Sequence, residues 1–263
     1  GRRLARLHRG EGVMSADAAL GFGDIAARYA ALRPAYPKAL FDFLEAHLEG
    51  PRDFAVDLGA GPAKASVDLA ARFARVAAVE PDARMLAAAP DHPRIERINC
   101  ASEAADFPDC GVDCVIAATA FHWMEQDVVT AKVARWLRPG GVFFPFLYGP
   151  FFVTGSARDV FRRHWKLWSP FMDKRLGAKA DYSAPMRASG AFSKLVSYSG
   201  EIDVTLPAAD AAGLLLTASY ARAYMAATGK AGAYVDQLAE ELGAHAPVTI
   251  GFPLGGVLGV RSN

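Results

Sequence analysis

The chain has 263 residues, of which 52% are hydrophobic and 22% are charged, and its formal net charge is +1. This length and apolar content fit one large α/β domain, or a domain with a sizeable insertion. The near-neutral charge argues against general nucleic-acid binding, and no apolar run approaches the roughly 18 residues of a membrane-spanning helix.

The beginning of the chain lacks the features of a secretory signal. Residues 1–13 are basic and contain no apolar segment of the required kind. Met14 is a candidate natural start, and residues 1–21 are expected to be a flexible N-terminus or a tag. A short amphipathic helix is predicted from Phe22 to about Leu32, because Pro34 disfavours helical geometry at the residue before it.

The next elements are a helix and a strand that ends in a glycine-rich turn. The helix starts at Pro37 and is stopped by Gly50-Pro51. The stretch 54–64 then indicates a buried strand, a tight turn and the start of a helix over 63–73, with Val67, Ala70 and Ala71 on its inner face. Glycines in the turn allow a sharp bend and a close approach to a ligand, Pro62 suits the first helical turn, and the helix N-terminus can face an anion.

Two ligand-binding patterns compete for this turn. The dinucleotide fingerprint G-x-G-x-x-G/A fails, because Lys64 stands at its sixth position. The shorter pattern, an acidic residue and two glycines after an apolar strand, resembles motif I of the class I S-adenosylmethionine-dependent methyltransferases, although Ala63 replaces a glycine that is frequent in that family. A strand-to-helix turn without a ligand remains the alternative. By the resemblance, the cofactor-binding residues of the turn are Asp57, Gly59, Ala60 and Gly61.

The same resemblance implies a fold. It is an α/β, doubly wound, Rossmann-like sheet of seven mostly parallel strands in the order 3-2-1-4-5-7-6, with the last strand antiparallel. The strands along the chain are expected at 54–58, 75–79, 95–99, 112–118, 142–146, 192–198 and 247–261. The further helices are expected at 82–89, 126–138, 157–168, 208–227 and 234–242.

Glu80 and Pro81 follow the second expected strand. A carboxylate at this place lies beside the first turn of a doubly wound sheet, and its two oxygens can accept both hydroxyls of a ribose. Taken alone, Glu80 would be an ordinary solvated charge. Its distance of nineteen residues from Gly61 suits a βαβ unit, so the two signals together predict a nucleoside ligand.

Two later segments extend the resemblance. Residues 100–109 resemble the Gly-x-Ala-Glu-x-x-x-x-Pro-Asp segment at the adenine edge of the cofactor, with Ser102 and Glu103 acting largely through their backbone; a plain polar loop is the alternative. Residues 120–123 match the Ala-Phe-His-Trp signature of a subgroup that includes trans-aconitate methyltransferase. They differ from the Asn-Pro-Pro-aromatic sequence of enzymes that methylate amino groups of nucleic acids and proteins.

The subgroup resemblance implies roles for residues at strand ends, where ligands of open α/β sheets gather. His122 becomes the candidate catalytic residue, with a structural role as the alternative; Trp123 would bind the acceptor, and Thr119 the cofactor. The phrase Tyr29…Arg33-Pro34-Ala35-Tyr36-Pro37 resembles the N-terminal segment of the subgroup, which would bring Tyr29 and Arg33 to the cofactor carboxylate or the acceptor.

Residues 148–190 are rich in aromatic and basic side chains. Phe161, Trp165 and Trp168 recur on one face of the helix expected there. We expect this segment to be a lid inserted in a methyltransferase domain of residues 22–263, with Trp165 and the later Tyr220 binding the acceptor. An extra helix that only fills core is the alternative.

The predicted function is transfer of a methyl group from S-adenosylmethionine to a small-molecule acceptor, such as a carboxylate or a hydroxyl. No metal is expected, because no cluster with ligand spacing stands out, and neither nucleic acid nor membrane is expected as a partner. Cys100, Cys110 and Cys114 are read as reduced thiols of a cytoplasmic protein. The competing functions are a non-catalytic binder of the cofactor, suggested by Ala63 and Cys100 at family glycine positions, and a nucleic-acid methyltransferase.

Overall fold

The computed structural model describes residues 34–174, 181–230 and 232–262. The expectations for residues 1–21, for the helix at 22–32 and for Tyr29 and Arg33 lie outside these residues. Among the described helices, none has the length and hydropathy needed to cross a bilayer.

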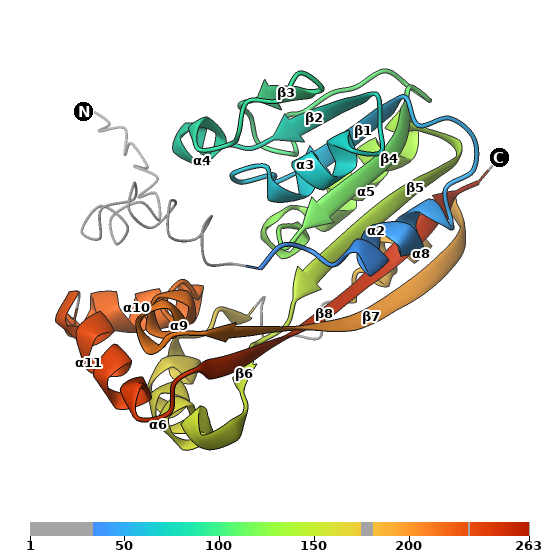
Figure 1. The fold of residues 1–263 in the computed structure, drawn as a ribbon. Coiled ribbons are helices and arrows are strands. Elements are labelled where there is room, and N and C mark those ends of the chain that lie inside the picture. The colour runs from blue at the N-terminus through green and yellow to red at the C-terminus, as the bar shows by residue number, and fades with distance from the viewer. Residues whose placement is uncertain (1–33, 175–180, 231, 263) are drawn as a thin grey trace, which may run out of the picture.

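The core of the protein is an eight-stranded sheet in the order β3-β2-β1-β4-β5-β8-β6, with β7 pairing to β8 (Figure 1). Its parallel part consists of β3 (Ile95–Ile98), β2 (Arg75–Val79), β1 (Phe54–Leu58), β4 (Val112–Ala118) and β5 (Leu137–Tyr148). Its antiparallel part consists of β8 (Val248–Arg261), β7 (Phe192–Leu206) and the short β6 (Phe152–Val153). The predicted order is confirmed, since β7 and β8 are the expected sixth and last strands, and β6 is an addition to it.

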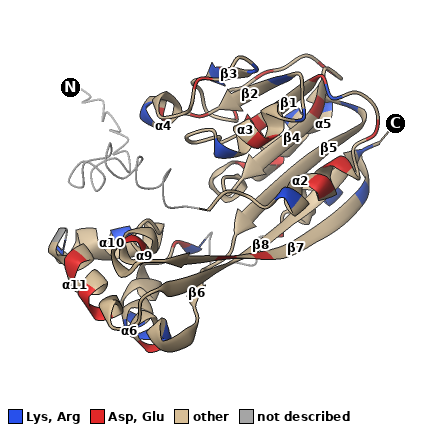
Figure 2. Cartoon of the chain, in the orientation of Figure 1, with Lys and Arg blue, Asp and Glu red and all other residues tan. Residues whose placement is uncertain are grey.

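Helices cover both faces of the parallel strands. On one face, α2 (Lys38–Glu45) and α3 (Lys64–Ala70) pack against side chains such as Ile116 and Phe144. On the other face, α5 (Gln126–Trp136) and α8 (Ser183–Ser189) pack against side chains such as Val115 and Phe143. Most of the sheet is uncharged, and Lys, Arg, Asp and Glu lie mainly on helices and connecting segments (Figure 2), as expected for strands that are buried on both faces.

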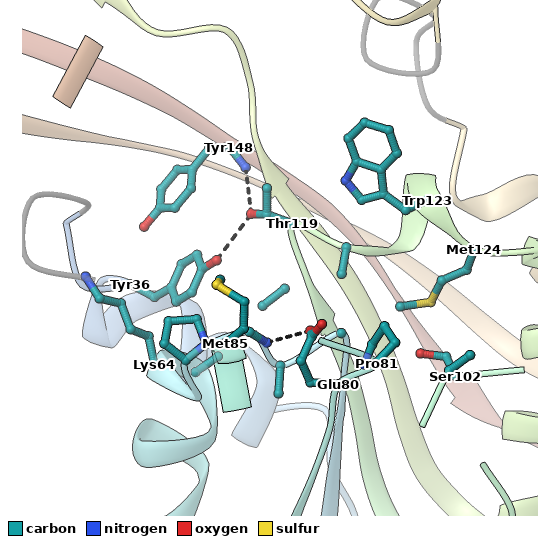
Figure 3. A pocket seen from close by; sticks show the side chains of 18 of the residues that line it. Tyr36, Lys64, Glu80, Pro81, Met85, Ser102, Thr119, Trp123, Met124 and Tyr148 are labelled. Atoms are coloured by element: carbon teal, nitrogen blue, oxygen red, sulfur yellow. Dashed lines mark hydrogen bonds between the residues drawn. The ribbon is translucent and has the colours of Figure 1, made fainter. Parts of the chain in front are cut away.

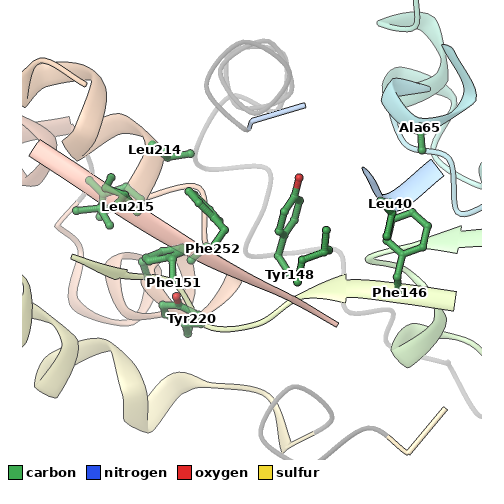
Figure 4. Close-up of a cluster of buried hydrophobic side chains, with 14 of the residues drawn as sticks. Leu40, Ala65, Phe146, Tyr148, Phe151, Leu214, Leu215, Tyr220 and Phe252 are labelled. Carbon is green, nitrogen blue, oxygen red and sulfur yellow. The ribbon is translucent and has the colours of Figure 1, made fainter. Parts of the chain in front are cut away.

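A second lobe is attached to the far ends of β7 and β8 (Figure 1). Its helices are α6 (Arg158–Trp168), α9 (Ala208–Leu215), α10 (Ser219–Thr228) and α11 (Gly232–Gly243). The remaining short elements are α4 (Ala83–Ala87) and the 3-10 turns η2 (Phe121–Trp123), η3 (Gly155–Ala157) and η4 (Ser169–Phe171). Figure 4 shows one hydrophobic core that extends from Leu40 and Phe146 through Tyr148 and Phe252 to Leu215 in this lobe.

The aromatic face of α6 packs inside the second lobe. Trp168 is fully buried, and its Nε1 donates to the Tyr234 hydroxyl at 3.0 Å. His164, also buried, lies with Nδ1 2.5 Å from the same hydroxyl and with Nε2 3.1 Å from a Glu241 carboxylate oxygen. These contacts join α6 to α11, so the two helices form one packed unit.

Several predicted helix ends are wrong. The helix starting after Pro37 ends at Glu45 rather than near Gly50. The helix at 126–138 ends at Trp136, since Leu137 already pairs with Val112 in the sheet. The helix at 208–227 is two helices, broken where the Thr217 hydroxyl bonds the Leu214 carbonyl at 2.6 Å.

The predicted inner face of α3 is right for Ala70 and wrong for Val67 and Ala71. Ala63 is not helical but left-handed, with φ 59°, and the helix begins only at Lys64, so Pro62 lies in the turn before it. Ala65, Ser66, Leu69 and Ala70 are buried, while Val67 is 38% exposed and Ala71 is exposed. A non-glycine residue in this conformation costs about 1–2 kcal/mol, which explains in physical terms why glycine suits this position.

Candidate active site

A cavity of about 380 Å³ lies at the carboxyl ends of β1, β2 and β4 (Figure 3). It brings together most of the residues predicted to bind the cofactor, and one predicted to bind the acceptor. These are Gly59, Ala60, Gly61, Glu80, Pro81, Ser102, Glu103, Thr119 and Trp123. Four different inter-strand segments supply them, as expected for the ligand-binding edge of an open α/β sheet. We call this space the first cavity.

The turn after β1 forms the floor of the first cavity. Gly59 has φ 67°, and a Cβ at this residue would lie 2.5 Å from the Ala120 Cβ, so a side chain does not fit there. The backbone N–H groups of Gly59 and Ala60 both donate to the Val79 carbonyl, at 2.8 and 3.0 Å. The turn is therefore held against the end of β2, with bare backbone facing the cavity.

Glu80 is held in place by the backbone around it. One carboxylate oxygen accepts the Gly61 N–H at 2.9 Å, and the other accepts the Asp82 N–H at 2.9 Å. A carboxylate oxygen can accept more than one hydrogen bond, so Glu80 retains acceptor capacity on both oxygens. It thus fixes the glycine turn and at the same time offers two oriented acceptors to a ligand in the cavity.

Asp57 does not line the first cavity. It is fully buried in β1, where one oxygen accepts the Ser66 hydroxyl at 2.7 Å and the other has no hydrogen-bond partner among the described residues. Burial raises the pKa of Asp57 to about 7; the Ser66 hydrogen bond lowers it, and the charge of Glu80 raises it further. Asp57 therefore contacts α3 through Ser66 from within the core, on the side of the turn that faces away from the cavity.

The raised pKa of Asp57 predicts a pH-dependent stability. The folded state binds this proton more tightly than the unfolded state, so the contribution of Asp57 is largest below pH 4, falls as the pH rises to about 7, and is constant above that. The shift from 3.8 corresponds to about 4 kcal/mol at about 1.4 kcal/mol per pKa unit. Urea unfolding of wild type and Asp57→Asn at pH 4.5, near the lower end of this range, and at pH 8, about one unit above its upper end, measures most of it.

The comparison with Asp57→Asn separates this group from carboxylates with the opposite behaviour, such as Glu241, whose pKa is lowered to about 2. The stability advantage of wild type over Asp57→Asn should shrink between the two pH values. An advantage that stays constant or grows with pH would show that Asp57 is ionised in the folded protein.

Thr119, directly after β4, adopts a strained conformation at one wall of the first cavity. Its φ is 57°, which is rare for a β-branched residue and costs energy that the surroundings must offset. Its hydroxyl lies 3.2 Å from the Tyr36 hydroxyl and accepts the Tyr148 N–H at 3.4 Å. The Tyr36 and Tyr148 rings stack at 5.0 Å with 8° between their planes, so these three residues form a single wall (Figure 3).

Several residues that line the first cavity were not predicted from the sequence. They are Pro34, Tyr36, Pro62, Lys64, Ala65, Met85, Ala101, Ala118, Ala120, Met124 and Tyr148. The position of Tyr148 at the carboxyl end of β5 could have indicated that it lines the ligand site. Tyr36 stands in the N-terminal motif, but no role was predicted for it. Met85 and Met124 carried no local signal, because a methionine after a turn is equally compatible with core packing.

A second cavity of about 160 Å³ adjoins the first and shares Thr119, Trp123 and Tyr148 with it. Its other lining residues are His122, Leu147, Gly149, Pro150, Phe151, Met172, Thr217, Ala218, Ser219, Tyr220 and Arg222. Of the predicted acceptor residues, Trp123 and Tyr220 line this space. Trp165 lines neither cavity, and its ring packs edge-on against Tyr220 at 5.2 Å.

His122 lines the second cavity but not the first. It is only 4% exposed, and its Nδ1 lies 3.2 Å from the Tyr182 hydroxyl. Burial raises the pKa of Tyr182, so its hydroxyl keeps its proton. The hydroxyl can donate to Nδ1, which leaves the imidazole proton on Nε2, or accept from Nδ1, which leaves Nε2 free to take a proton.

Within the described part of the chain, no three His, Cys, Asp or Glu side chains gather in a group that could hold a metal ion. The site thus consists of two adjoining cavities, one with a glycine turn and a positioned carboxylate, and one with a histidine beside aromatic walls.

Comparisons with known proteins agree with this geometry. Residues 56–144 match the family model described as a methyltransferase domain. A solved structure of a candidate type II methyltransferase from Anaeromyxobacter dehalogenans is 30% identical, with a TM-score of 0.73, and the match covers 88% of this chain and 99% of that one.

Two further proteins match over less of their length. A Dictyostelium discoideum protein named as a methyltransferase is 31% identical over 157 residues, 57% of this chain and 60% of the relative, so less than two thirds of its length is spanned. The phosphoethanolamine N-methyltransferase 2 of Haemonchus contortus, solved with S-adenosyl-L-methionine, has a TM-score of 0.55 at 16% identity over 96% of this chain and 61% of that one, which shows a shared fold. The chain therefore belongs to the class I S-adenosylmethionine-dependent methyltransferases, the family whose cofactor is S-adenosylmethionine.

Proposed function

We propose that the protein transfers the methyl group of S-adenosylmethionine to a small-molecule acceptor with an oxygen nucleophile, a carboxylate or a hydroxyl, bound in the second cavity. The observation that carries the proposal is the junction of the two cavities at Thr119, Trp123 and Tyr148. A methyl group in the first cavity and a nucleophile in the second can meet only at such a junction.

The first cavity fits the cofactor. The glycine turn leaves no room for a Cβ at Gly59, and Glu80 offers two acceptor oxygens of the kind that a ribose diol requires. Ser102 and Glu103 line the space beyond Glu80, where we place the adenine. When bound, the cofactor supplies a methyl group on a sulfonium, which is already a good electrophile, so positioning by the protein does most of the work.

The charge of the second cavity supports an oxygen nucleophile. Among its described lining residues, Arg222 and His122 are basic, and none is Asp or Glu. The described lining therefore offers no carboxylate to pair with a protonated amine, whereas a carboxylate or a neutral hydroxyl needs none. The aromatic rings of Trp123, Phe151 and Tyr220 suit an apolar body on the same molecule.

His122 is proposed to orient the acceptor, or to take its proton when the acceptor is a hydroxyl. A carboxylate acceptor is already deprotonated and needs no base. The Tyr182 hydroxyl contacts Nδ1, and the imidazole takes the proton only in the tautomer in which Nδ1 donates to that hydroxyl. The sequence Ala120-Phe121-His122-Trp123, which resembles the trans-aconitate methyltransferase-like subgroup, supports this assignment.

Of the segment 148–190 predicted to be a lid, residues 148–174 are proposed to cover the acceptor site, whereas α8 packs against the sheet. Tyr148 to Phe151 and Met172 belong to this segment and line the second cavity. The helix α6 contributes indirectly, since Trp165 packs behind Tyr220.

An acceptor screen tests the proposal. Carboxylic acids, alcohols and amines that share the same apolar skeletons are offered with S-adenosylmethionine, and release of S-adenosylhomocysteine is measured. We expect turnover with acids or alcohols, and we expect the acceptor to slow amide hydrogen exchange across residues 148–174. Turnover confined to the amines, or to nucleic acids with steep salt dependence, would contradict the proposal.

A further inference from the structure

We infer that Lys64 binds the carboxylate of the cofactor's amino-acid group and so sets the position of the cofactor along the first cavity. This inference depends on the proposed placement of the ribose at Glu80. Lys64 is also the residue that stands where the dinucleotide fingerprint requires glycine or alanine, and the inference gives it a role.

Lys64 is the first residue of α3 and lines the first cavity. Among the described lining residues, it is the only Lys or Arg, and the acidic ones are Glu80 and Glu103. Among the described residues, Lys64 therefore offers the charge that a bound carboxylate requires, while Arg33, which the resemblance would bring to the same carboxylate, lies outside them.

Lys64 and Ser102 lie on opposite sides of Glu80 along the first cavity (Figure 3). In Figure 3, Lys64 lies with Tyr36 on one side of Glu80, while Ser102 and Met124 lie on the other. S-adenosylmethionine is an elongated molecule with adenine at one end, the ribose between, and an amino acid at the other end. With its diol at Glu80 and its adenine at Ser102, its amino-acid end must extend toward Lys64.

The backbone before Lys64 fixes where its side chain starts. Ala63 is fully buried and left-handed, its N–H donates to the Ala60 carbonyl at 2.9 Å, and its carbonyl accepts the Val67 N–H at 3.1 Å. Such a strained residue is retained only where the surroundings determine it strongly. The first turn of α3 is thus rigidly joined to the glycine turn, and Lys64 leaves it beside the cavity.

The test compares ligands with and without the carboxylate by calorimetry. Lys64→Met keeps the apolar stem and removes the charge, and Lys64→Arg keeps the charge. We expect Lys64→Met to weaken S-adenosylhomocysteine by about tenfold, the lower end of the effect of a hydrogen bond to a charged group. Binding of 5′-methylthioadenosine, which lacks the amino-acid group, should be unchanged, and Lys64→Arg should retain most of the affinity for both ligands.

Glu80→Ala is measured beside these variants, because it should weaken both ligands alike. If Lys64→Met weakens both ligands equally, or neither, the inference about Lys64 is wrong. If Glu80→Ala weakens neither ligand, the ribose does not lie at Glu80, and the inference about Lys64 is then wrong as well. The lysine that serves as a control is Lys38, whose side chain is 81% exposed and paired with Asp42, so Lys38→Met should change neither affinity.

Discussion

Replacing Glu80 by alanine is expected to weaken binding of S-adenosylmethionine by about ten- to a hundredfold, because each hydrogen bond to a charged group contributes roughly 1.5–3 kcal/mol. Glu80 lines the first cavity, and its two oxygens are aimed by the N–H groups of Gly61 and Asp82. The alanine variant would leave the ribose hydroxyls without acceptors and release the glycine turn. Calorimetric titration, with circular dichroism to verify folding, measures the effect.

The geometry at Glu80 makes a second variant informative. In Glu80→Gln, the amide nitrogen must face one of the two backbone N–H groups that the carboxylate accepts, so a donor would meet a donor. We expect Glu80→Gln to bind nearly as poorly as the alanine variant. Glu201, exposed on β7, provides the matched control, and Glu201→Ala should bind normally. Unchanged affinity in folded Glu80→Ala would refute the assignment.

Replacing His122 by alanine is expected to lower kcat by about a hundredfold, the lower end of the range for a positioned proton-transfer group. Cofactor affinity should remain nearly unchanged, because His122 lines the second cavity and not the first. Steady-state kinetics with the acceptor identified by the screen, together with calorimetry of the cofactor, separates the two effects.

Tyr182→Phe distinguishes a chemical role of His122 from a structural one. This change removes the hydroxyl 3.2 Å from His122 Nδ1 and keeps the buried ring that packs against Phe121. If His122 acts on the acceptor, the variant should shift the pH dependence of kcat while the protein stays folded. His92, half-buried in the segment before β3 and outside the lining of both cavities, is the control, and His92→Ala should leave kcat unchanged. A normal kcat in His122→Ala would assign the ring to core packing alone.

Much of the site was determined by the sequence itself, because its residues directly follow strands. Gly59, Glu80 and Thr119 each stand at the carboxyl end of a buried apolar run, and such ends meet at one edge of a doubly wound sheet. Local patterns thus placed them in one cavity. The strand order followed from the family resemblance rather than from periodicity.

Only the tertiary structure decided the ends and faces of the helices. The inner face of α3 depends on the left-handed Ala63 and on the bond from Ser66 to Asp57, which are contacts across a turn and not a helical repeat. The end of α5 depends on the pairing of Leu137 with Val112. Leu137 and Val112 lie too far apart in the sequence for a window of a dozen residues to contain both. Ser66 and Asp57 are only nine residues apart, but their bond depends on the conformation of the turn between them.

The second cavity was likewise decided by tertiary structure. Its walls come from the segment after β4, the segment after β5 and the start of α10, which the fold of the second lobe brings together. Tyr182 reaches His122 across 60 residues, and Trp165, on the aromatic face of α6, packs behind Tyr220 instead of lining the cavity. Periodicity identifies which face of a helix is apolar, but the surface that this face meets is set by the packing of the whole chain.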